Sequence, residues 1–346
     1  MCLSLHNSGN NVFLVGRKLN NDLLFTRPYK VKRFSMFFKK GFLFYMFFNI
    51  RLFLFLLFSK CDVYFSNDLD TLLANFLASK IKNKPLVYDS HELFTEVPEL
   101  INKSFIKSFW VQMESVFFPK LKHTITVSEG IASFYKKKYK KSVLVVKNVP
   151  FLNKDFSTEK ESFNLLNFDK NHKNIIYQGS LNKDRGISLM IDAMVYVNAN
   201  LFLLGAGDLE WDLRKNVSQK GLSKKIFFVG RLPFQKLKNI TKKFDLGLSF
   251  EEDTCLAYRF SLPNKIFDYV HAGIPVLASD LPDISRFIIE NNIGEVLSSR
   301  SPEKIASQMT KMLTKKDFYS EYLKEAKNKF CWEQEGAKVV NLFNHL

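Results

Sequence analysis

Short runs of β-branched and aromatic residues alternate with helical stretches along almost the whole chain. Strands that alternate with helices form parallel, doubly wound sheets. The sequence therefore predicts an α/β fold built from two Rossmann-like units, one in each half. The expected strands are residues 12–15, 62–65, 86–88, 124–127 and 143–146, and then 175–177, 201–204, 226–229, 246–250 and 276–278.

The length of the chain also indicates two domains. At 346 residues it exceeds the roughly 150 residues of an average domain more than twofold. A polar stretch without periodicity, residues 153–174, is the expected linker. We therefore expect domains at 1–150 and 151–319, facing each other across a cleft, and closing helices at 320–346 that are candidates for packing back on the first domain.

Most expected strands of the second half end in glycine or a polar residue, as at Gly179, Gly205-Ala206-Gly207 and Gly230. Ligands of open α/β sheets bind outside the carboxyl ends of the strands, where glycine allows the backbone to approach a phosphate. The second half is therefore the better candidate for binding phosphate groups.

The segment 261–279 reads as a helix, a tight turn and a strand. Helical spacing places Asn264, Asp268 and His271 on one polar face, with Lys265 at its edge, opposite an apolar side of Ile266, Phe267 and Val270. The first amides of this helix, together with Lys265, could hold a diphosphate, and Asp268 could accept hydrogen bonds from a ribose. The alternative is an ordinary solvated helix face.

Two further polar segments follow expected strands. Residues 179–186 bring Lys183 and Arg185 to the end of a strand, and arginine suits bidentate contact with phosphate. In the first half, Asp89-Ser90-His91-Glu92 follows the strand at 86–88. An imidazole among polar groups at such a position favours a functional role for His91. The alternatives are a charged surface loop and a structural histidine.

Charge indicates anionic partners. The chain has 51 Lys and Arg against 34 Asp and Glu, a formal net charge of +17, and its first 60 residues carry a single acid, Asp22. Nucleotide phosphates, acidic lipids and nucleic acids all fit such a charge. The lysine-rich run 135–141 with interleaved tyrosines raises nucleic-acid binding, but no nucleic-acid module accompanies it, and we expect none.

The four cysteines are widely spaced, so neither a zinc site nor a disulfide framework is expected, and the start of the chain has no secretory-signal pattern. The stretch Gly41–Phe58 is nearly long and apolar enough to span a bilayer, but Asn49 and Arg51 interrupt it. We expect a buried helix, or one at the membrane surface.

Taken together, these motifs resemble the family 4 retaining glycosyltransferases of the GT-B fold. The order G-x-x-x-x-x-[RK]-G, G-x-G, a strand ending in glycine, and P-N-K-I-F-D-Y-x-x-A-G-x-P-V carries the resemblance in the second half. The segments 66–70 and 89–98, SNDLD and DSHELFTEVP, look like a branch that builds bacterial surface polysaccharides.

The resemblance implies a role for each candidate residue. It assigns the transferred sugar or the chemistry to His91 and Glu92, with Glu251 and Glu252 as further candidates for sugar contact. It assigns the donor diphosphate to Gly179, Arg185, Gly186, Asn264 and Lys265, and the ribose or nucleoside to Asp268, Gly207 and Arg231.

The same resemblance implies a nucleotide-sugar donor, UDP- or GDP-linked, a lipid-linked or glycan acceptor in polysaccharide or lipopolysaccharide synthesis, and neither metal nor cofactor. It places the chain in the cytoplasm, peripheral on the inner face of the cell membrane, with the basic first domain on anionic lipid and no nucleic-acid partner.

Three departures from the family pattern leave alternatives open. Phe260 stands where the family has the first glutamate of its carboxylate pair, and Asp268 replaces the second. The chain opens inside an expected helix at 1–9, so the first strand of the first domain is expected to be missing. A sugar-nucleotide 2-epimerase of the same fold and a non-catalytic partner protein are therefore alternatives.

Overall fold

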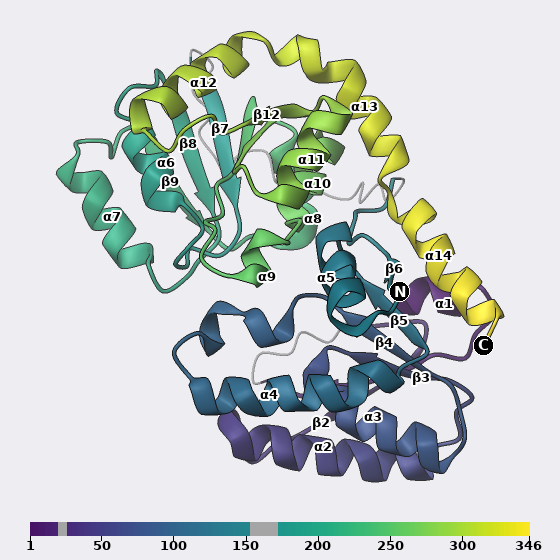
Figure 1. Ribbon diagram of the computed structural model, residues 1–346. Coiled ribbons are helices and arrows are strands. Elements are labelled where there is room, and N and C mark those ends of the chain that lie inside the picture. The colour runs from purple at the N-terminus through teal and green to yellow at the C-terminus, as the bar shows by residue number, and fades with distance from the viewer. Residues whose placement is uncertain (20–25, 153–171) are drawn as a thin grey trace. The chain divides into compact units, whose positions relative to one another are not determined.

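The computed structural model describes residues 1–19, 26–152 and 172–346, which form two compact units (Figure 1). The first comprises Met1–Lys147 with Glu333–Leu346, and the second comprises Asn148–Trp332. Most of the linker expected at 153–174 lies outside the described residues. The two units are described separately below.

The first unit contains a parallel four-stranded sheet in the order β3-β4-β5-β6 and a parallel pair, β1-β2. Strand β2 was not anticipated, because its alternating basic residues are almost all exposed. The elements are α1 (Cys2–Asn7), β1 (Phe13–Arg17), β2 (Lys30–Phe34), α2 (Gly41–Phe58), β3 (Tyr64–Asn67), α3 (Leu69–Ile81), β4 (Leu86–Ser90), α4 (Ser104–Phe117), β5 (His123–Thr126), α5 (Glu129–Tyr139) and β6 (Leu144–Val145).

Helix α14 (Trp332–Asn344) completes the first unit from the far end of the chain. The buried carboxylate of Glu335 accepts a hydrogen bond from the backbone N–H of Lys147 at 2.9 Å, and the rings of Phe65 and Phe343 stack. Of the closing helices expected at 320–346, only this one belongs to the first unit, and α13 (Ser320–Lys329) belongs to the second.

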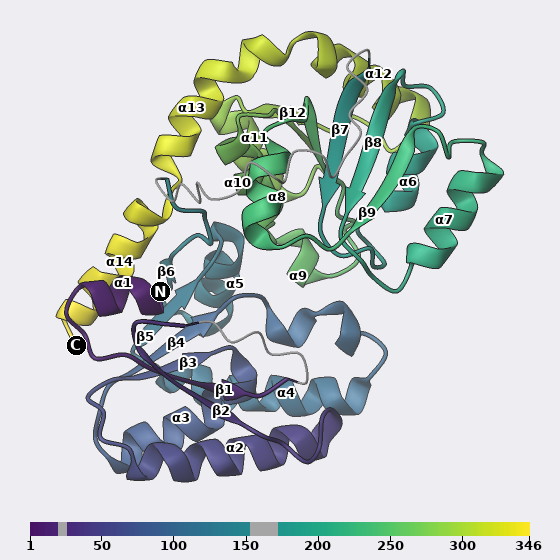
Figure 2. The same cartoon turned by 180° about the vertical axis from the view of Figure 1, so that it is seen from behind.

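The second unit is built around one parallel six-stranded sheet in the order β12-β11-β10-β7-β8-β9 (Figure 2). Its strands are β7 (Lys173–Gln178), β8 (Ala199–Leu204), β9 (Ile226–Gly230), β10 (Leu246–Ser249), β11 (Val276–Ala278) and β12 (Gly294–Val296). Its helices are α6 (Ile187–Ala193), α7 (Glu210–Gln219), α8 (Phe234–Thr241), α9 (Leu256–Arg259), α10 (Asn264–Ala272), α11 (Pro282–Asn291), α12 (Pro302–Thr314) and α13.

The strand order reverses between β7 and β10, which is the doubly wound Rossmann arrangement. Apolar side chains of the central strands are inaccessible to solvent on both faces, among them Ile175, Ile176, Leu203, Leu246 and Leu248. The prediction of two Rossmann-like units with parallel sheets is therefore confirmed. Among the described residues 172–346, the one strand that was missed is β12, three residues long.

Candidate functional site

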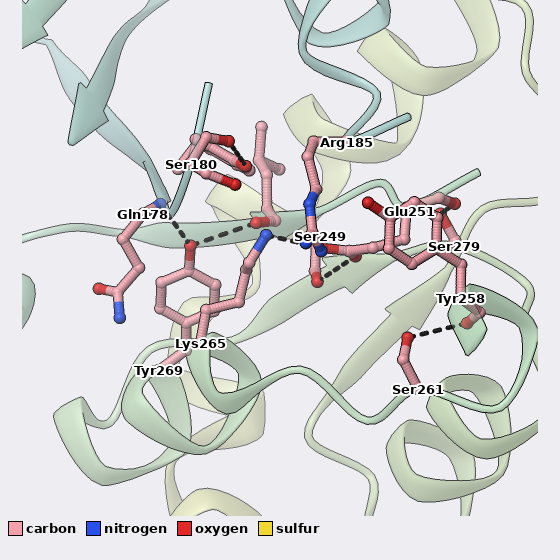
Figure 3. A network of polar contacts seen from close by, with 12 residues as sticks. Gln178, Ser180, Arg185, Ser249, Glu251, Tyr258, Ser261, Lys265, Tyr269 and Ser279 are labelled. Atoms are coloured by element: carbon pink, nitrogen blue, oxygen red, sulfur yellow. Dashed lines mark hydrogen bonds and ion pairs between the residues drawn. The ribbon is translucent and has the colours of Figure 1, made fainter. Parts of the chain in front are cut away.

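The candidate site of the second unit lies where the sheet reverses its strand order. The carboxyl ends of β7 and β10 meet there, followed by Gly179 on one strand and Glu251 on the other, and α10 supplies Lys265. Ligands of doubly wound sheets bind at such a switch point because the connections diverge on either side of it. Three segments far apart in the chain thus place polar side chains at one position (Figure 3).

A buried ion pair forms the centre of this cluster. Nζ of Lys265 donates to Oε1 of Glu251 at 2.7 Å, and Oγ of Ser249 donates to Oε2 at 2.6 Å (Figure 3). Burial acts to raise the pKa of Glu251, but the charge and hydrogen bond of Lys265 and the hydrogen bond of Ser249 together hold this pKa below its ordinary value. Glu251 is therefore a carboxylate at neutral pH.

This burial changes the interpretation of two residues. Lys265 was placed at the edge of a polar helix face, and His271 on that face, yet both side chains are buried. Nε2 of His271 lies 2.8 Å from the carbonyl oxygen of Phe330. The solvated-face alternative for α10 is therefore wrong for Lys265 and His271. The carboxylate of Glu251 is occupied by Lys265 and Ser249, so the geometry supports a positioning role rather than contact with a sugar.

Arg185 is the more accessible cation of the cluster. Its NH1 lies 3.8 Å from Oε1 of Glu251, and its guanidinium lies 4.7 Å from the ring centre of Tyr258. Nε of Arg185 has no hydrogen-bond partner among the described residues, although it is buried. Two cations thus share one carboxylate, which leaves one positive charge in excess for an anionic ligand.

Glycines shape the loop that carries Arg185. Gly186 has φ +66°, and a Cβ there would lie 2.2 Å from the carbonyl oxygen of Phe250. Gly205 has φ +150°, and a Cβ there would lie 1.8 Å from the carbonyl oxygen of Gly179. Only glycine allows these backbones to pack so closely. Gly179 itself lies beside Lys265, and Gly207 packs against Leu181 of the same loop.

Asp268 lies one turn beyond Lys265 on α10, beside a small pocket that is also lined by Gln178, Leu237 and Thr241. Nε2 of Gln178 donates to Oδ2 of Asp268 at 2.6 Å, and Thr241 donates to Oε1 of Gln178 at 3.2 Å. Burial raises the pKa of Asp268 to about 6, and the hydrogen bond from Gln178 and the charge of Lys238 oppose the increase. A carboxylate acceptor thus lines a pocket.

The remaining predicted residues of this unit lie further out. Asn264 is exposed at the first turn of α10, and Arg231 is exposed just after β9. Glu252 is half-buried, and its backbone N–H donates to the carbonyl oxygen of Asp184 at 3.0 Å. Gln178, Ser249 and Thr241 were not predicted. Their signal in the sequence was a polar residue at the end of a strand or helix.

The first unit holds a second polar cluster at the end of β4. Nε2 of His91 lies 2.9 Å from Oδ2 of the buried Asp89, and the backbone N–H of His91 donates to Oδ1 of Asp68 at 3.0 Å. The contact with Asp89 raises the pKa of His91 above its ordinary value, and burial opposes the increase. Asp68 has φ +54°, an uncommon backbone conformation for a residue other than glycine. Glu92 is exposed beside this pair.

Of the two tyrosines in the lysine-rich run at 135–141, Tyr135 belongs to the core of the first unit and Tyr139 is half-buried. The ring of Tyr135 is fully buried and stacks on Phe118, with centres 4.2 Å apart, and Tyr139 stacks on the same ring at 4.8 Å. The ring of Tyr135 is therefore not available to stack on nucleic-acid bases.

Two family models match adjoining parts of the chain. Residues 1–148 match the model described as glycosyltransferase family 4, and residues 158–329 match glycosyl transferases group 1.

Two curated proteins are similar over part of their length. An uncharacterized glycosyltransferase of Methanocaldococcus jannaschii is 25% identical over 49% of this chain and 44% of its own. The chitobiosyldiphosphodolichol beta-mannosyltransferase of Candida albicans is 24% identical over 66% of this chain and 54% of its own length. The chain thus spans about half the length of these relatives.

Solved structures share the fold at low sequence identity. Sucrose-phosphate synthase from Thermosynechococcus elongatus superposes with a TM-score of 0.80 at 16% identity over 99% of this chain and 90% of that one. WaaG, a glycosyltransferase involved in lipopolysaccharide biosynthesis, superposes with a TM-score of 0.68 at 13% identity. The match covers 99% of this chain and 93% of WaaG. Anabaena HepE in complex with UDP-glucose superposes with a TM-score of 0.69 at 15% identity. The match covers 92% of this chain and 86% of HepE. The names of these matches do not favour the epimerase alternative.

Proposed function

Because the chain belongs to the family 4 group of glycosyltransferases and has their GT-B fold, we propose that it transfers a sugar from a nucleoside-diphosphate sugar to an acceptor. The observation that carries the proposal is the pair of cations, Lys265 and Arg185, at the switch point of the second sheet. UDP or GDP is the proposed nucleotide, and UDP-glucose in Anabaena HepE supports a donor of this class.

In this proposal the second unit stabilises the charge that develops as the nucleoside diphosphate leaves. Arg185 contacts the diphosphate directly, and Glu251 holds Lys265 beneath it. The first backbone amides of α10, at the exposed Asn264, and the loop from Gly179 to Gly186 supply further donors. Positive charge fixed in place needs no reorganisation during the reaction, and the proposed chemistry uses neither a metal nor a cofactor.

The nucleoside lies on the other side of the diphosphate. Asp268 accepts from a ribose hydroxyl, because it is only half-buried and its carboxylate has capacity beyond its hydrogen bond to Gln178. Gly207 and Arg231 follow β8 and β9 and are the proposed contacts of the nucleoside. His91 and Glu92 of the first unit are the proposed contacts of the transferred sugar, with Asp89 and Asp68 holding His91 in position.

The finer parts of the proposal rest on the motifs. They are retention of the anomeric configuration, a lipid-linked or glycan acceptor, and a place in bacterial surface polysaccharide or lipopolysaccharide synthesis. The proposed location is cytoplasmic, peripheral on the inner face of the cell membrane. The basic and aromatic first unit supports an anionic membrane surface as a partner.

Thermal unfolding in the presence of UDP, GDP, ADP, TDP and CMP tests the donor site, because a ligand that binds only the folded state raises the midpoint. We expect one diphosphate to give a shift that Arg185→Gln abolishes. Arg214→Gln is the matched control, since Arg214 makes an exposed ion pair within α7, and it should keep the full shift. No shift with any nucleotide would overturn the donor assignment.

A second measurement separates transfer from the alternatives. With a donor carrying the base so identified and a membrane extract as acceptor source, we expect free nucleoside diphosphate to be released together with labelled glycan or lipid. An epimerase would convert the donor without labelling an acceptor. A non-catalytic partner protein would bind the nucleotide and release nothing.

A further inference from the structure

Helix α2 carries a second, outward-facing apolar stripe. Phe44, Phe48, Leu52 and Leu56 are its buried positions, one on each turn. On the opposite side Leu43, Phe47, Ile50 and Leu54 are each between 44% and 50% exposed. An ordinary surface helix has polar side chains at the positions that face water. These four residues, called the α2 stripe below, repeat at helical spacing and are all large and apolar.

The α2 stripe continues into neighbouring aromatic residues. Phe38 stacks on Phe47 with ring centres 5.3 Å apart, and Phe37 next to it is 90% exposed. At the other side, Phe42 contacts Phe109 of α4 at 6.3 Å, and α4 adds the exposed Phe105. A group of exposed large apolar side chains of this kind marks an interaction site.

The charged side chains on α2 and on the segment just before it are all basic. Lys39 and Lys40 lie between Phe37 and Phe42 and are exposed, and Arg51 is exposed on α2 itself. Among the described residues from Met1 to Lys60 there is no Asp or Glu. A buried protein interface would not gain from a rim of one charge unless its partner were acidic. An anionic lipid surface offers both apolar depth and negative charge.

The packing of α2 favours a helix in the plane of the membrane interface over one that crosses it. Length and composition alone would permit α2 to span a membrane. However, Nδ2 of Asn49 donates to the carbonyl oxygen of Asp70 at 2.8 Å, and NH1 of Arg51 donates to that of Ser35 at 2.7 Å. α2 also packs along α3, and Phe55 contacts Phe13 and Phe34 of the β1-β2 pair. Spanning would remove a buried face from the first unit.

We propose that the α2 stripe, with Phe37, Phe42 and Phe105, inserts into the interface of an anionic bilayer while Lys39, Lys40 and Arg51 contact lipid phosphates. This assignment rests on the proposed peripheral membrane location and names the surface that performs it. In both views of the fold α2 runs along an outer edge of the first unit (Figures 1 and 2), and the exposure of the four stripe residues comes from the described residues of the structure.

Flotation of the full chain with lipid vesicles tests the proposal. Vesicles of phosphatidylcholine, with or without phosphatidylglycerol, are the probes. We expect binding to the anionic vesicles, and a loss of about tenfold or more in affinity when Leu43, Phe47, Ile50 and Leu54 are all changed to Gln. The matched control changes four exposed apolar residues of the second unit, Val195, Trp211, Ile289 and Phe318, to Gln and should bind as the unchanged chain does.

A charge variant tests the basic rim separately. Lys39→Glu with Lys40→Glu should weaken binding to anionic vesicles, and the remaining affinity should depend less on salt. Equal flotation by the stripe variant and the unchanged chain would overturn the proposal. So would a dimer that the stripe variant converts to monomer without any lipid binding, since the stripe would then face a second copy.

Two controls keep the outcomes distinct. Resistance of the vesicle-bound chain to alkaline extraction would indicate a spanning helix and overturn the in-plane assignment. The stripe variant should keep the nucleotide-induced thermal shift, because its changes lie in the first unit. Loss of lipid binding with that shift intact separates failure at the membrane surface from failure of the donor site.

Discussion

The buried pair of Lys265 and Glu251 makes the proposed donor site depend on two side chains that cannot be removed independently. Their contact of 2.7 Å is fully screened from solvent on the carboxylate side. Removing one member of a buried ion pair leaves an uncompensated charge and costs about 3–5 kcal/mol, whereas replacing both members is often nearly neutral. Loss of activity in a Lys265 variant alone would therefore not distinguish ligand contact from misfolding.

We predict that Lys265→Met lowers the free energy of unfolding by several kcal/mol and that adding Glu251→Gln recovers most of the loss. Urea unfolding of the two single variants and the double variant measures this coupling. The double variant should still fail to bind the nucleoside diphosphate, because the cation is gone. Full binding by the folded double variant would show that Lys265 does not serve the ligand.

Asp268 provides a pH-dependent signal at the same site. Its pKa of about 6 in the folded protein exceeds the ordinary value of 3.8, so the folded state binds the proton more tightly than the unfolded state. The free energy of unfolding should therefore rise as pH falls from about 6 to about 4. A difference of about two units makes the ionised form cost about 3 kcal/mol at neutral pH.

We predict that Asp268→Asn stabilises the chain by about 3 kcal/mol at pH 7.5 and by much less at pH 4.5. The comparison requires urea unfolding of both proteins at both pH values. Nucleotide binding by the unchanged chain should weaken as the pH falls below about 6, because the proposed ribose contact needs the ionised carboxylate of Asp268. An identical stability difference at both pH values would contradict the raised pKa.

At the scale of elements, the loop between β7 and α6 determines where Arg185 lies. Gly186 has a left-handed backbone, and a Cβ at this position would clash with the carbonyl oxygen of Phe250. Gly221 has a similar φ of +69°, but a Cβ there would meet no atom within 4 Å. The left-handed conformation costs about 1–2 kcal/mol for an ordinary residue. Alanine substitutions at Gly186 and Gly221 therefore separate two costs: that of the left-handed backbone, which both positions have, and that of the clash with Phe250, which only Gly186 has.

We predict that Gly221→Ala lowers the free energy of unfolding by about 1 kcal/mol and keeps the nucleotide-induced shift. Gly186→Ala should cost clearly more and should weaken nucleotide binding, because the loop must move away from Phe250 and carry Arg185 with it. Thermal unfolding with and without the diphosphate measures both quantities. Equal behaviour of the two variants would show that the loop tolerates the displacement.

At the scale of the whole molecule, local signals predicted the sheets, and contacts between distant segments were not predictable. The strand-helix alternation and the terminal glycines were sufficient for two parallel sheets, because both are properties of neighbouring residues. The exposed, alternating basic residues of β2 gave no apolar run. Helical spacing predicted the position of Lys265 on α10. Its ion pair with Glu251 could not be predicted, because Glu251 follows β10, a separate element of the chain.

The same distinction holds in the first unit. Asp89 and His91 are near neighbours in sequence, so a contact between them was within reach of sequence analysis. Asp68 approaches His91 only because Asn67 and Asp89 are paired in the parallel register of β3 and β4. The apolar composition of α2 was plain, but which of its positions face outward depends on the packing of α3 and the β1-β2 pair.

The course of the chain also links the stability of the first unit to its last helix. α14 belongs to that unit although all of the second unit precedes it in sequence. Its Glu335 and Val339 are buried, and Lys338 donates to the carbonyl oxygen of Val145 at 3.3 Å. The contacts of α14 therefore stabilise the first unit from the far end of the chain.

We predict that ending the chain at Trp332 lowers the unfolding midpoint of the first unit and leaves that of the second unchanged. Each compact unit should unfold as a cooperative step, and a bound nucleoside diphosphate identifies the step of the second unit by raising its midpoint. Calorimetry with and without nucleotide measures both steps. Glu335→Gln with Lys338→Gln should weaken the first step in the same direction, because the backbone N–H of Lys147 keeps only a neutral acceptor. A truncation that lowers the nucleotide-sensitive step instead would place α14 with the second unit.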